Sequence, residues 1–311
     1  MTEPTSKPTQ TTAASQQSAH GPHFELASLP ETRIESLKLV RPRGTGYAIP
    51  ELSRACLIRL IDFPEMPFRT SVRETIKAGR SALLVRTELP INGKMTPVAY
   101  KRVRRRNWLK KLTLLFRASR PLRAWRLTHE FLHRGIPTAR PVAVILPRGA
   151  SLGADAYLIT EWIAGGAHPA EFGRLLRPFE PRAGVRRLHK AARRLGELIG
   201  RMHAQNVAHR DLKPGNVLLQ DRDDDVAAYV IDLDGASILP FVSRRTRVRD
   251  LSRLAIGLVD ASDIGRTARL RFLQSYLGAA EQRNWNWKSA WREIAVATNV
   301  RRIRKKKTGP S

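Results

Sequence analysis

The apolar positions in the first half of the chain come in short runs that are typical of β-strands. Residues 82–86 (Ala-Leu-Leu-Val-Arg) and 97–103 (Pro-Val-Ala-Tyr-Lys-Arg-Val) form two such runs. The Asn92-Gly93 pair between them has the composition of a tight turn. A helical stretch then leads to Glu130, and residues 141–145 and 156–160 return to strand character. The pattern predicts a small sheet with one helix packed on it.

After Gly165-Gly166 the apolar spacing becomes mainly that of helices. One face with a 3.6-residue period comprises Leu188, Ala191, Ala192, Leu195, Leu198, Ile199 and Met202. Two short strands follow, at 217–219 and 229–231. The Asp-rich segment 221–225 between them is interpreted as a solvated hairpin turn, since no helix with further ligands flanks it.

These patterns divide the chain into four parts. A sheet-rich region is expected at 23–162 and a mainly helical region at 163–300. Residues 1–22 carry almost no large apolar side chain, so they are expected to be a disordered tail. Residues 301–311 are expected to be a basic tail that frays into solvent.

The charge is strongly unbalanced. Lys and Arg number 56 against 27 Asp and Glu, for a net charge of +29, which favours polyanionic partners: nucleic acid, an anionic membrane surface or a phosphorylated substrate. Eleven of the basic residues and no acid lie between Lys101 and Arg126, and residues 102–126 are interpreted as a basic insert. Within it, Trp108, Leu112, Leu115 and Phe116 share one helical face. That face either lies in an anionic membrane interface or packs on the sheet, and both interpretations stay open.

The compartment is expected to be the cytoplasm. Cys56 is the only cysteine, so the chain can form no intramolecular disulfide. The first residues lack the layout of a secretory signal, and no apolar run is long enough to cross a bilayer. Any membrane contact is therefore expected to be peripheral.

A loop from His209 to Asn216 carries the residues that phosphoryl transfer requires. It reads His-Arg-Asp-Leu-Lys-Pro-Gly-Asn, and Asp232 follows sixteen residues later at the end of an apolar run. Asp211 is expected to orient or deprotonate an acceptor hydroxyl, and Lys213 to steady the γ-phosphate of ATP. Asn216 and Asp232 are expected to coordinate Mg²⁺. The spacing indicates an ATP-dependent kinase.

Other nucleotide contacts are expected upstream of this loop. Lys101 ends a strand, where a lysine can reach the α- and β-phosphates, and Glu130 is the candidate for pairing with it because no acid lies between them. Glu161 lies in the expected connection between lobes, where backbone groups meet adenine. The phosphate-covering loop has no glycine-rich motif, and its nearest candidates are Gly79 and Arg80. Downstream, Asp234 is expected either to assist the metal or to accept hydrogen bonds from the following turn.

The order of these parts is that of an α+β, protein-kinase-like fold with two lobes, a small antiparallel-sheet N-lobe and a mainly helical C-lobe. Only seventeen residues separate Asp232 from Asp250, where a helical pattern begins. Protein kinases use a longer segment there, with an Ala-Pro-Glu element, to hold a substrate peptide. A small molecule, a sugar or a lipid-linked glycan is therefore the expected acceptor.

The arrangement resembles the lipopolysaccharide kinase family, over roughly residues 75–280. The similar segments are 97–103, Glu130 with 134–141, 209–216, 230–236 and 249–254. The resemblance implies ATP-dependent transfer to a sugar hydroxyl of the inner core, of Kdo or heptose, at the inner membrane face. The matching positions are Lys101, Glu130, Asp211, Asn216 and Asp232. The implied partners are ATP, an anionic lipid-linked saccharide and an anionic membrane surface.

Two other functions compete with this interpretation. One is a reduced protein Ser/Thr kinase, because Asp-Leu-Lys-Pro-Gly-Asn resembles the loop of those enzymes. The other is a non-catalytic basic protein that binds nucleic acid on a kinase-like scaffold. Every catalytic position is occupied and no stacking-aromatic motif alternates with the charge, so nucleic acid is ranked last as a partner.

Overall fold

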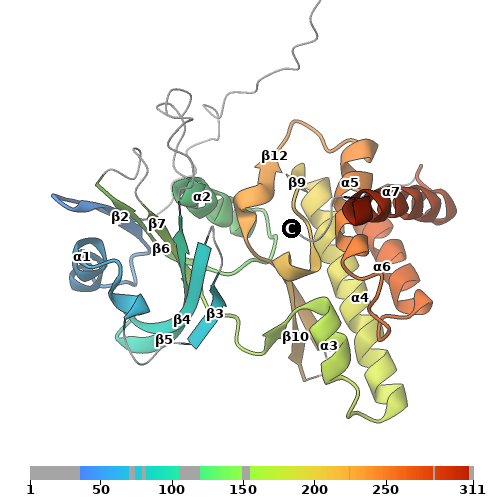
Figure 1. The fold of residues 1–311 in the computed structure, drawn as a ribbon, viewed down its shortest axis with the longest axis horizontal. Coiled ribbons are helices and arrows are strands. Elements are labelled where there is room, and N and C mark those ends of the chain that lie inside the picture. The colour runs from blue at the N-terminus through green and yellow to red at the C-terminus, as the bar shows by residue number, and fades with distance from the viewer. Residues whose placement is uncertain are drawn as a thin grey trace, which may run out of the picture. The chain divides into compact units, whose positions relative to one another are not determined.

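A seven-stranded antiparallel sheet forms the first lobe of the computed structural model (Figure 1). The structure describes residues 36–69, 74–78, 82–104, 120–148, 155–223, 225–282 and 284–307. Within these residues the strand order is β1 (Leu37–Arg41), β2 (Gly44–Ala48), β6 (Pro141–Pro147), β7 (Ala156–Glu161), β5 (Lys94–Val103), β4 (Ala82–Ile91) and β3 (Glu74–Ala78). The strands expected from the apolar runs correspond to β4, β5, β6 and β7.

The hairpin between β4 and β5 follows directly from its two turn residues. Ile91 pairs with Lys94, which leaves Asn92 and Gly93 as a two-residue loop. Both have left-handed backbone angles, with φ of 51° and 73°. Asn and Gly tolerate these angles best, and the resulting turn matches the twist of the strands. The predicted turn is confirmed, and it sets the register that places Lys101 on β5.

Two helices pack on this sheet. Helix α1 (Arg54–Asp62) contacts β1, β2 and β6, and Gly46 makes room for it, since a Cβ there would lie 2.8 Å from Leu57 Cδ1. Helix α2 (Arg120–His133) contacts β6 and β7. It places Trp125 in the core of the sheet lobe and Phe131 in the core of the helical lobe. Helix α2 therefore belongs to both cores.

The second lobe is mainly helical, as predicted. Its helices are α3 (Pro169–Leu175), α4 (Pro181–Ala204), α5 (Arg244–Ile256), α6 (Arg266–Ala279) and α7 (Trp287–Lys307). Strands β8 (Gly166–Ala167), β10 (Val217–Arg222) and β11 (Asp225–Val230) form one small sheet, and β9 (Val207–His209) pairs with β12 (Ala236–Ile238). The apolar face predicted on α4 is confirmed by its buried members Ala191, Leu195, Leu198, Ile199 and Met202.

Helices α4 and α6 approach closely because glycines lie between them. A Cβ on Gly196 would collide with the carbonyl oxygen of Phe272, and a Cβ on Gly200 would lie 2.7 Å from that of Tyr276. Backbone cannot move away from such contacts as a flexible side chain can. The two glycines therefore fix how the two helices sit against each other.

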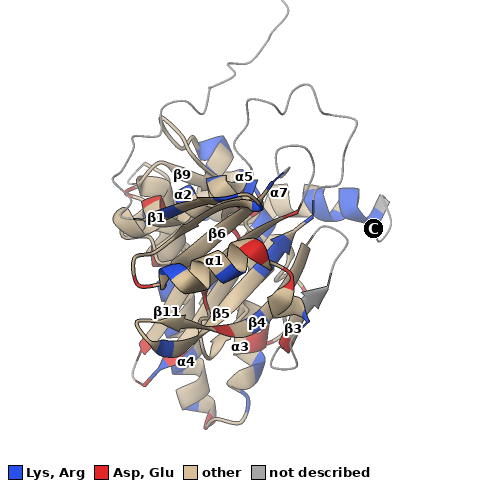
Figure 2. Cartoon of the chain, turned by 90° about the vertical axis from the view of Figure 1, so that its left-hand side faces the viewer, with Lys and Arg blue, Asp and Glu red and all other residues tan. Residues whose placement is uncertain are grey.

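Two boundaries differ from the sequence expectation. Helix α5 begins at Arg244, six residues before Asp250, because Ser243 accepts a hydrogen bond from Thr246 N and caps an arginine-rich first turn that has little apolar periodicity. Helix α7 continues to Lys307, so the first part of the basic tail is helical rather than frayed. Its last turns consist mostly of Lys and Arg, which are blue in Figure 2. None of the described helices is both long and apolar enough to cross a membrane.

Candidate active site

The loop after β9 is fixed from three sides. Strand β12 pairs with β9, with Ala236 opposite His209, and Arg210 N donates to the carbonyl of Gly235 at 3.0 Å. From α5, the fully buried carboxylate of Asp250 accepts from His209 N at 2.9 Å. A Cβ on Gly235 would lie 3.1 Å from Asp211 Cβ. The sequence Asp-Leu-Asp-Gly therefore ends in the one residue that lets this turn lie against the loop.

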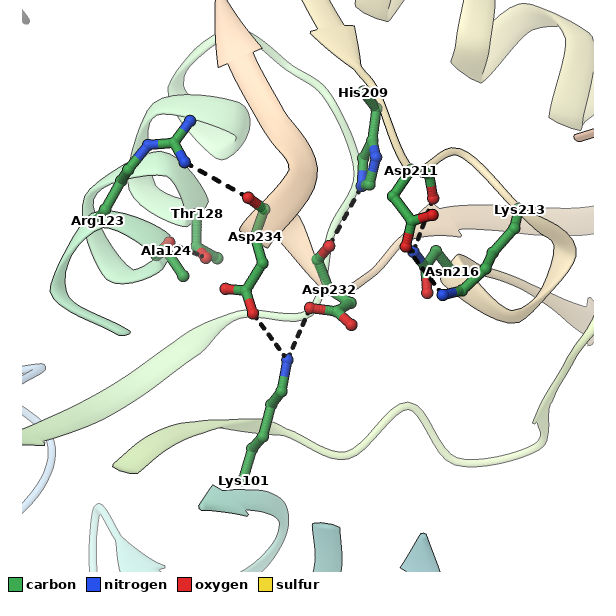
Figure 3. Close-up of polar contacts among 10 residues, drawn as sticks. All are labelled: Lys101, Arg123, Ala124, Thr128, His209, Asp211, Lys213, Asn216, Asp232 and Asp234. Carbon is green, nitrogen blue, oxygen red and sulfur yellow. Dashed lines mark hydrogen bonds and ion pairs between the residues drawn. The ribbon is translucent and has the colours of Figure 1, made fainter. Parts of the chain in front are cut away.

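Asp211, Lys213 and Asn216 come together as expected (Figure 3). Lys213 Nζ lies 2.8 Å from Asp211 Oδ2, and Asn216 Nδ2 donates to the Asp211 carbonyl at 2.8 Å. The Asp211 carboxylate also accepts from Arg253 Nη1 of α5 at 3.4 Å. The carboxylate is 44% exposed, so an acceptor can reach it.

Asp232 faces the loop from a left-handed turn. Its φ is 58°, a conformation that Asp tolerates better than most residues. His209 Nε2 donates to its carbonyl at 3.2 Å and holds the turn in place. Burial lowers the pKa of His209, so the ring is neutral at pH 7 and keeps a single N–H for this bond.

Lys101 crosses from β5 to this turn. Its Nζ lies 2.6 Å from Asp232 Oδ1 and 3.4 Å from Asp234 Oδ2. Burial alone would lower the pKa of Lys101, but the charges of Asp234 and Asp232 outweigh it and raise that pKa. Burial alone would raise the pKa of Asp232, and Lys101 outweighs it and lowers that pKa. Lys101 and Asp232 are therefore both charged at neutral pH, and a cation from the sheet meets the side chains of two aspartates from the helical lobe.

Glu130 lies elsewhere on α2. Its buried side chain accepts from Arg134 Nε at 2.6 Å, and Arg134 also donates to the carbonyl of Gln205. No ion pair joins Glu130 to Lys101, both of which lie in the described part of the chain. Helix geometry explains the difference. Arg123 shares the face of Glu130 but lies seven residues, about 10 Å, earlier along the axis, and Arg123 is level with the Asp232 turn.

Arg123 is the α2 side chain that contacts this turn. Its guanidinium donates to the Asp234 carbonyl at 3.4 Å (Figure 3). It also donates to Ser237 Oγ at 3.2 Å and to the Ala236 carbonyl. Three contacts to consecutive parts of one turn hold α2 against the helical lobe. Two uses were expected for Asp234, assistance to the metal and acceptance of hydrogen bonds from the following turn. In the structure its carboxylate has a contact that neither expectation included, with Lys101.

The remaining expected residues divide into two groups. Glu161 ends β7 at the connection between the lobes, where its carboxylate accepts from Arg140 Nη1 at 3.1 Å and its backbone N donates to the Arg140 carbonyl. Gly79 and Arg80 lie outside the described residues, as do positions 105–119 of the basic insert. Arg102 lies in the first, described part of this insert and forms ion pairs with Asp155 and Glu65, so its charge is neutralised within the fold.

Asn216 and Asp232 are the residues expected to bind Mg²⁺. No group of three or more His, Cys, Asp or Glu side chains able to hold a metal occurs among the residues that the structure describes. Asn216 binds the loop through its amide nitrogen, which leaves the amide oxygen for a metal. Asp232 meets Lys101 through one carboxylate oxygen and is 38% exposed. One amide and one carboxylate oxygen suit Mg²⁺, which is commonly held by few protein oxygens together with substrate phosphates and water.

Sequence reasoning missed Arg253 and Arg123. Arg253 had a signal, because it follows Asp250 by three residues and so lies on the helix face that meets the loop. Arg123 had none, since it is one of eleven basic residues in an acid-free stretch.

One comparison with known proteins shows the family of this chain. The model described as "Lipopolysaccharide kinase (Kdo/WaaP) family" matches residues 91–276. A search among curated proteins found no match. Among solved structures, "WaaP in complex with acyl carrier protein" is similar with a TM-score of 0.50 and 20% identity, covering 75% of this chain and 88% of that one. This second likeness supports the two-lobed fold.

Proposed function

From the premise that the chain belongs to the lipopolysaccharide kinase (Kdo/WaaP) family, and is a kinase, we propose that it phosphorylates a sugar hydroxyl, of Kdo or heptose, in the lipopolysaccharide inner core. We propose that the reaction takes place at the cytoplasmic face of the membrane. One observation carries the proposal most: Lys101 from the sheet lobe and Asp232, Asp211 and Asn216 from the helical lobe converge at one site.

Each residue has a role that its contacts support. Asp211, exposed and held by Lys213 and Arg253, orients the acceptor hydroxyl and receives its proton. Lys213 faces the transferring phosphate, and Lys101 the phosphates that stay on the nucleotide. When bound, ATP supplies the phosphoryl group and Mg²⁺ neutralises part of the negative charge of the phosphates. Asn216 and Asp232 would hold the metal, with Lys101 keeping Asp232 ionised.

We propose that the adenine base of ATP binds at the connection between the lobes. Glu161 begins it, and Trp162 N already donates to the Pro97 carbonyl at 3.0 Å. Backbone groups of this connection would meet adenine. Gly79 and Arg80 are proposed to cover the phosphates, from the segment between β3 and β4.

The acceptor is proposed to be a saccharide because the described segment between Asp232 and α5 is short for a platform that holds a peptide. Helix α5 already begins at Arg244, so the connection is shorter than the sequence pattern indicated. The basic insert 102–126 is proposed to favour an anionic, lipid-linked acceptor and an anionic membrane surface. The similar WaaP structure contains acyl carrier protein, so that protein belongs among the additions tested.

The proposal is tested by label transfer. Protein is incubated with Mg²⁺ and γ-labelled ATP against lipid A-core extract, dephosphorylated core and a generic protein, each with and without acyl carrier protein. Label should enter the dephosphorylated core, and Asp211→Asn should abolish it. The matched control is Asp223→Asn, which removes one exposed carboxylate from the β10–β11 hairpin. Label entering only the protein would favour the reduced Ser/Thr kinase, and salt-sensitive nucleic-acid binding without transfer would favour the third function.

A further inference from the structure

A basic groove lies between α4 and α6, neither of which contributes to the catalytic loop or the Asp232 turn (Figure 1). Its volume is about 340 Å³. Its lining contains Arg186, His189, Lys190, Arg193, Arg271, Gln274 and Ser275, and no acidic side chain. A concave space with only basic and neutral polar walls differs from a solvated basic surface, because several donors can reach one ligand at once.

Helical spacing brings the lining together. The four α4 residues recur at intervals of three and four, which places them on one face. Arg271, Gln274 and Ser275 have the same spacing on α6 and face them. Close packing at Gly196 and Gly200, directly beyond the groove, fixes the two walls. The groove is therefore preformed.

The arginines on the neighbouring face of α4 are used differently. Arg187 pairs with Asp221, and Arg194 pairs with Asp225 and Glu197. In the groove, Arg193 has a longer contact of 3.7 Å to the already shared Glu197, and Arg271 has no ion pair with a described residue. Ion pairs with the β10–β11 hairpin thus neutralise Arg187 and Arg194, whereas Arg193 and Arg271 keep positive charge in the groove.

His189 adds a polar group of a different kind. Burial lowers its pKa, and the nearby charge of Arg271 lowers it further. The ring is therefore neutral at pH 7 and contributes one N–H donor rather than another cation. Guanidinium forks, an N–H, an amide and a hydroxyl together suit a ligand that only accepts hydrogen bonds and carries several charges.

We propose that the α4–α6 groove is a second anion site, separate from the nucleotide-phosphate site, that binds a phosphate group carrying two or more negative charges. Phosphate oxygens match the donors of the lining, and bidentate arginine contacts are the usual means of holding them. Such a phosphate could be in solution or on a lipid headgroup.

The test measures binding with two probes. Pyrophosphate is titrated calorimetrically at about 150 mM salt, a level that screens exposed charges, with a non-hydrolysable Mg·ATP analogue already bound. Vesicles of phosphatidylcholine with and without phosphatidic acid are tested by sedimentation. The variant is Arg186→Gln/Arg271→Gln, and the matched control is Arg245→Gln/Arg292→Gln, which removes two exposed arginines from α5 and α7.

The site is supported if the groove variant weakens pyrophosphate or phosphatidic-acid binding at least tenfold while the control stays within twofold of the wild type. If the groove variant weakens only pyrophosphate binding, the natural ligand is a phosphate in solution. If it weakens binding to phosphatidic-acid vesicles, the ligand is a lipid headgroup. The proposal is overturned if neither probe binds the wild type, or if groove and control variants bind alike. Binding is read without turnover, so these outcomes do not depend on the proposed kinase reaction.

Discussion

Lys101 provides the sharpest test of the site's geometry, because the structure pairs it with Asp232 and Asp234 rather than with Glu130. At an effective dielectric constant of about 20, contacts of 2.6 and 3.4 Å correspond to attractions of about 6 and about 5 kcal/mol. The carboxylates are 38% and 33% exposed, so solvent screening and desolvation offset most of this. We expect Lys101→Met to lower the free energy of unfolding by about 1–2 kcal/mol.

Double-mutant cycles separate the two possible partners. Urea unfolding of Lys101→Met, Asp234→Asn and their combination should give a coupling energy of about 1 kcal/mol. The matched cycle with Glu130→Gln should give less than about 0.3 kcal/mol, since Glu130 binds Arg134 instead. A larger coupling to Glu130 than to Asp234 would refute the geometry of the site.

Three further outcomes follow from single contacts. Arg253→Gln should lower kcat by about tenfold and change the KM for ATP by less than twofold, because Arg253 contacts Asp211 rather than the residues expected to bind ATP. The control variant Arg245→Gln should leave both constants unchanged. Gly196→Ala should destabilise by about 1–3 kcal/mol in urea unfolding, since its Cβ meets the Phe272 carbonyl, whereas Gly278→Ala, with nothing within 4 Å, should not destabilise. Burial lowers the pKa of His203, so the unfolded chain takes up more protons as pH falls through about 6.5, and stability should decline below that pH. His203→Gln should flatten the decline between pH 7 and 5.5, and an unchanged slope would assign the effect to other groups.

Local chemistry made part of the fold predictable. The Asn92-Gly93 turn and the apolar face of α4 depend on neighbours in sequence, and both were found as expected. The start of α5 was not, because the Ser243 cap is a single side chain before an arginine-rich turn with little apolar period. Strands β1 and β2 were also missed: Gly44 and Gly46 suggest a loop, and only packing against β6 and α1 explains them.

The candidate site also has a part that the sequence predicted and a part that it did not. Asp211, Lys213 and Asn216 share one loop, so their meeting follows from spacing alone. Lys101 and Asp232 are 131 residues apart. The order of parts predicted that both serve the nucleotide, but it did not predict that they contact each other. The partner of Lys101 could not be predicted, because which turn of α2 is level with the lysine depends on how α2 docks on both cores. A shift of two turns exchanges Glu130 for Arg123.

The central claim is that this chain transfers the γ-phosphoryl group of ATP directly to an inner-core sugar hydroxyl, leaving ADP, while Asp211 orients that hydroxyl and receives its proton. The most direct measurement is mass spectrometry of dephosphorylated inner-core saccharide after incubation with Mg·ATP and either wild type, Asp211→Asn or Asp223→Asn. The account predicts a gain of one phosphate on a Kdo or heptose residue with wild type and Asp223→Asn, and none with Asp211→Asn. Saccharide left unmodified by the wild type, or modified equally by Asp211→Asn, would contradict it.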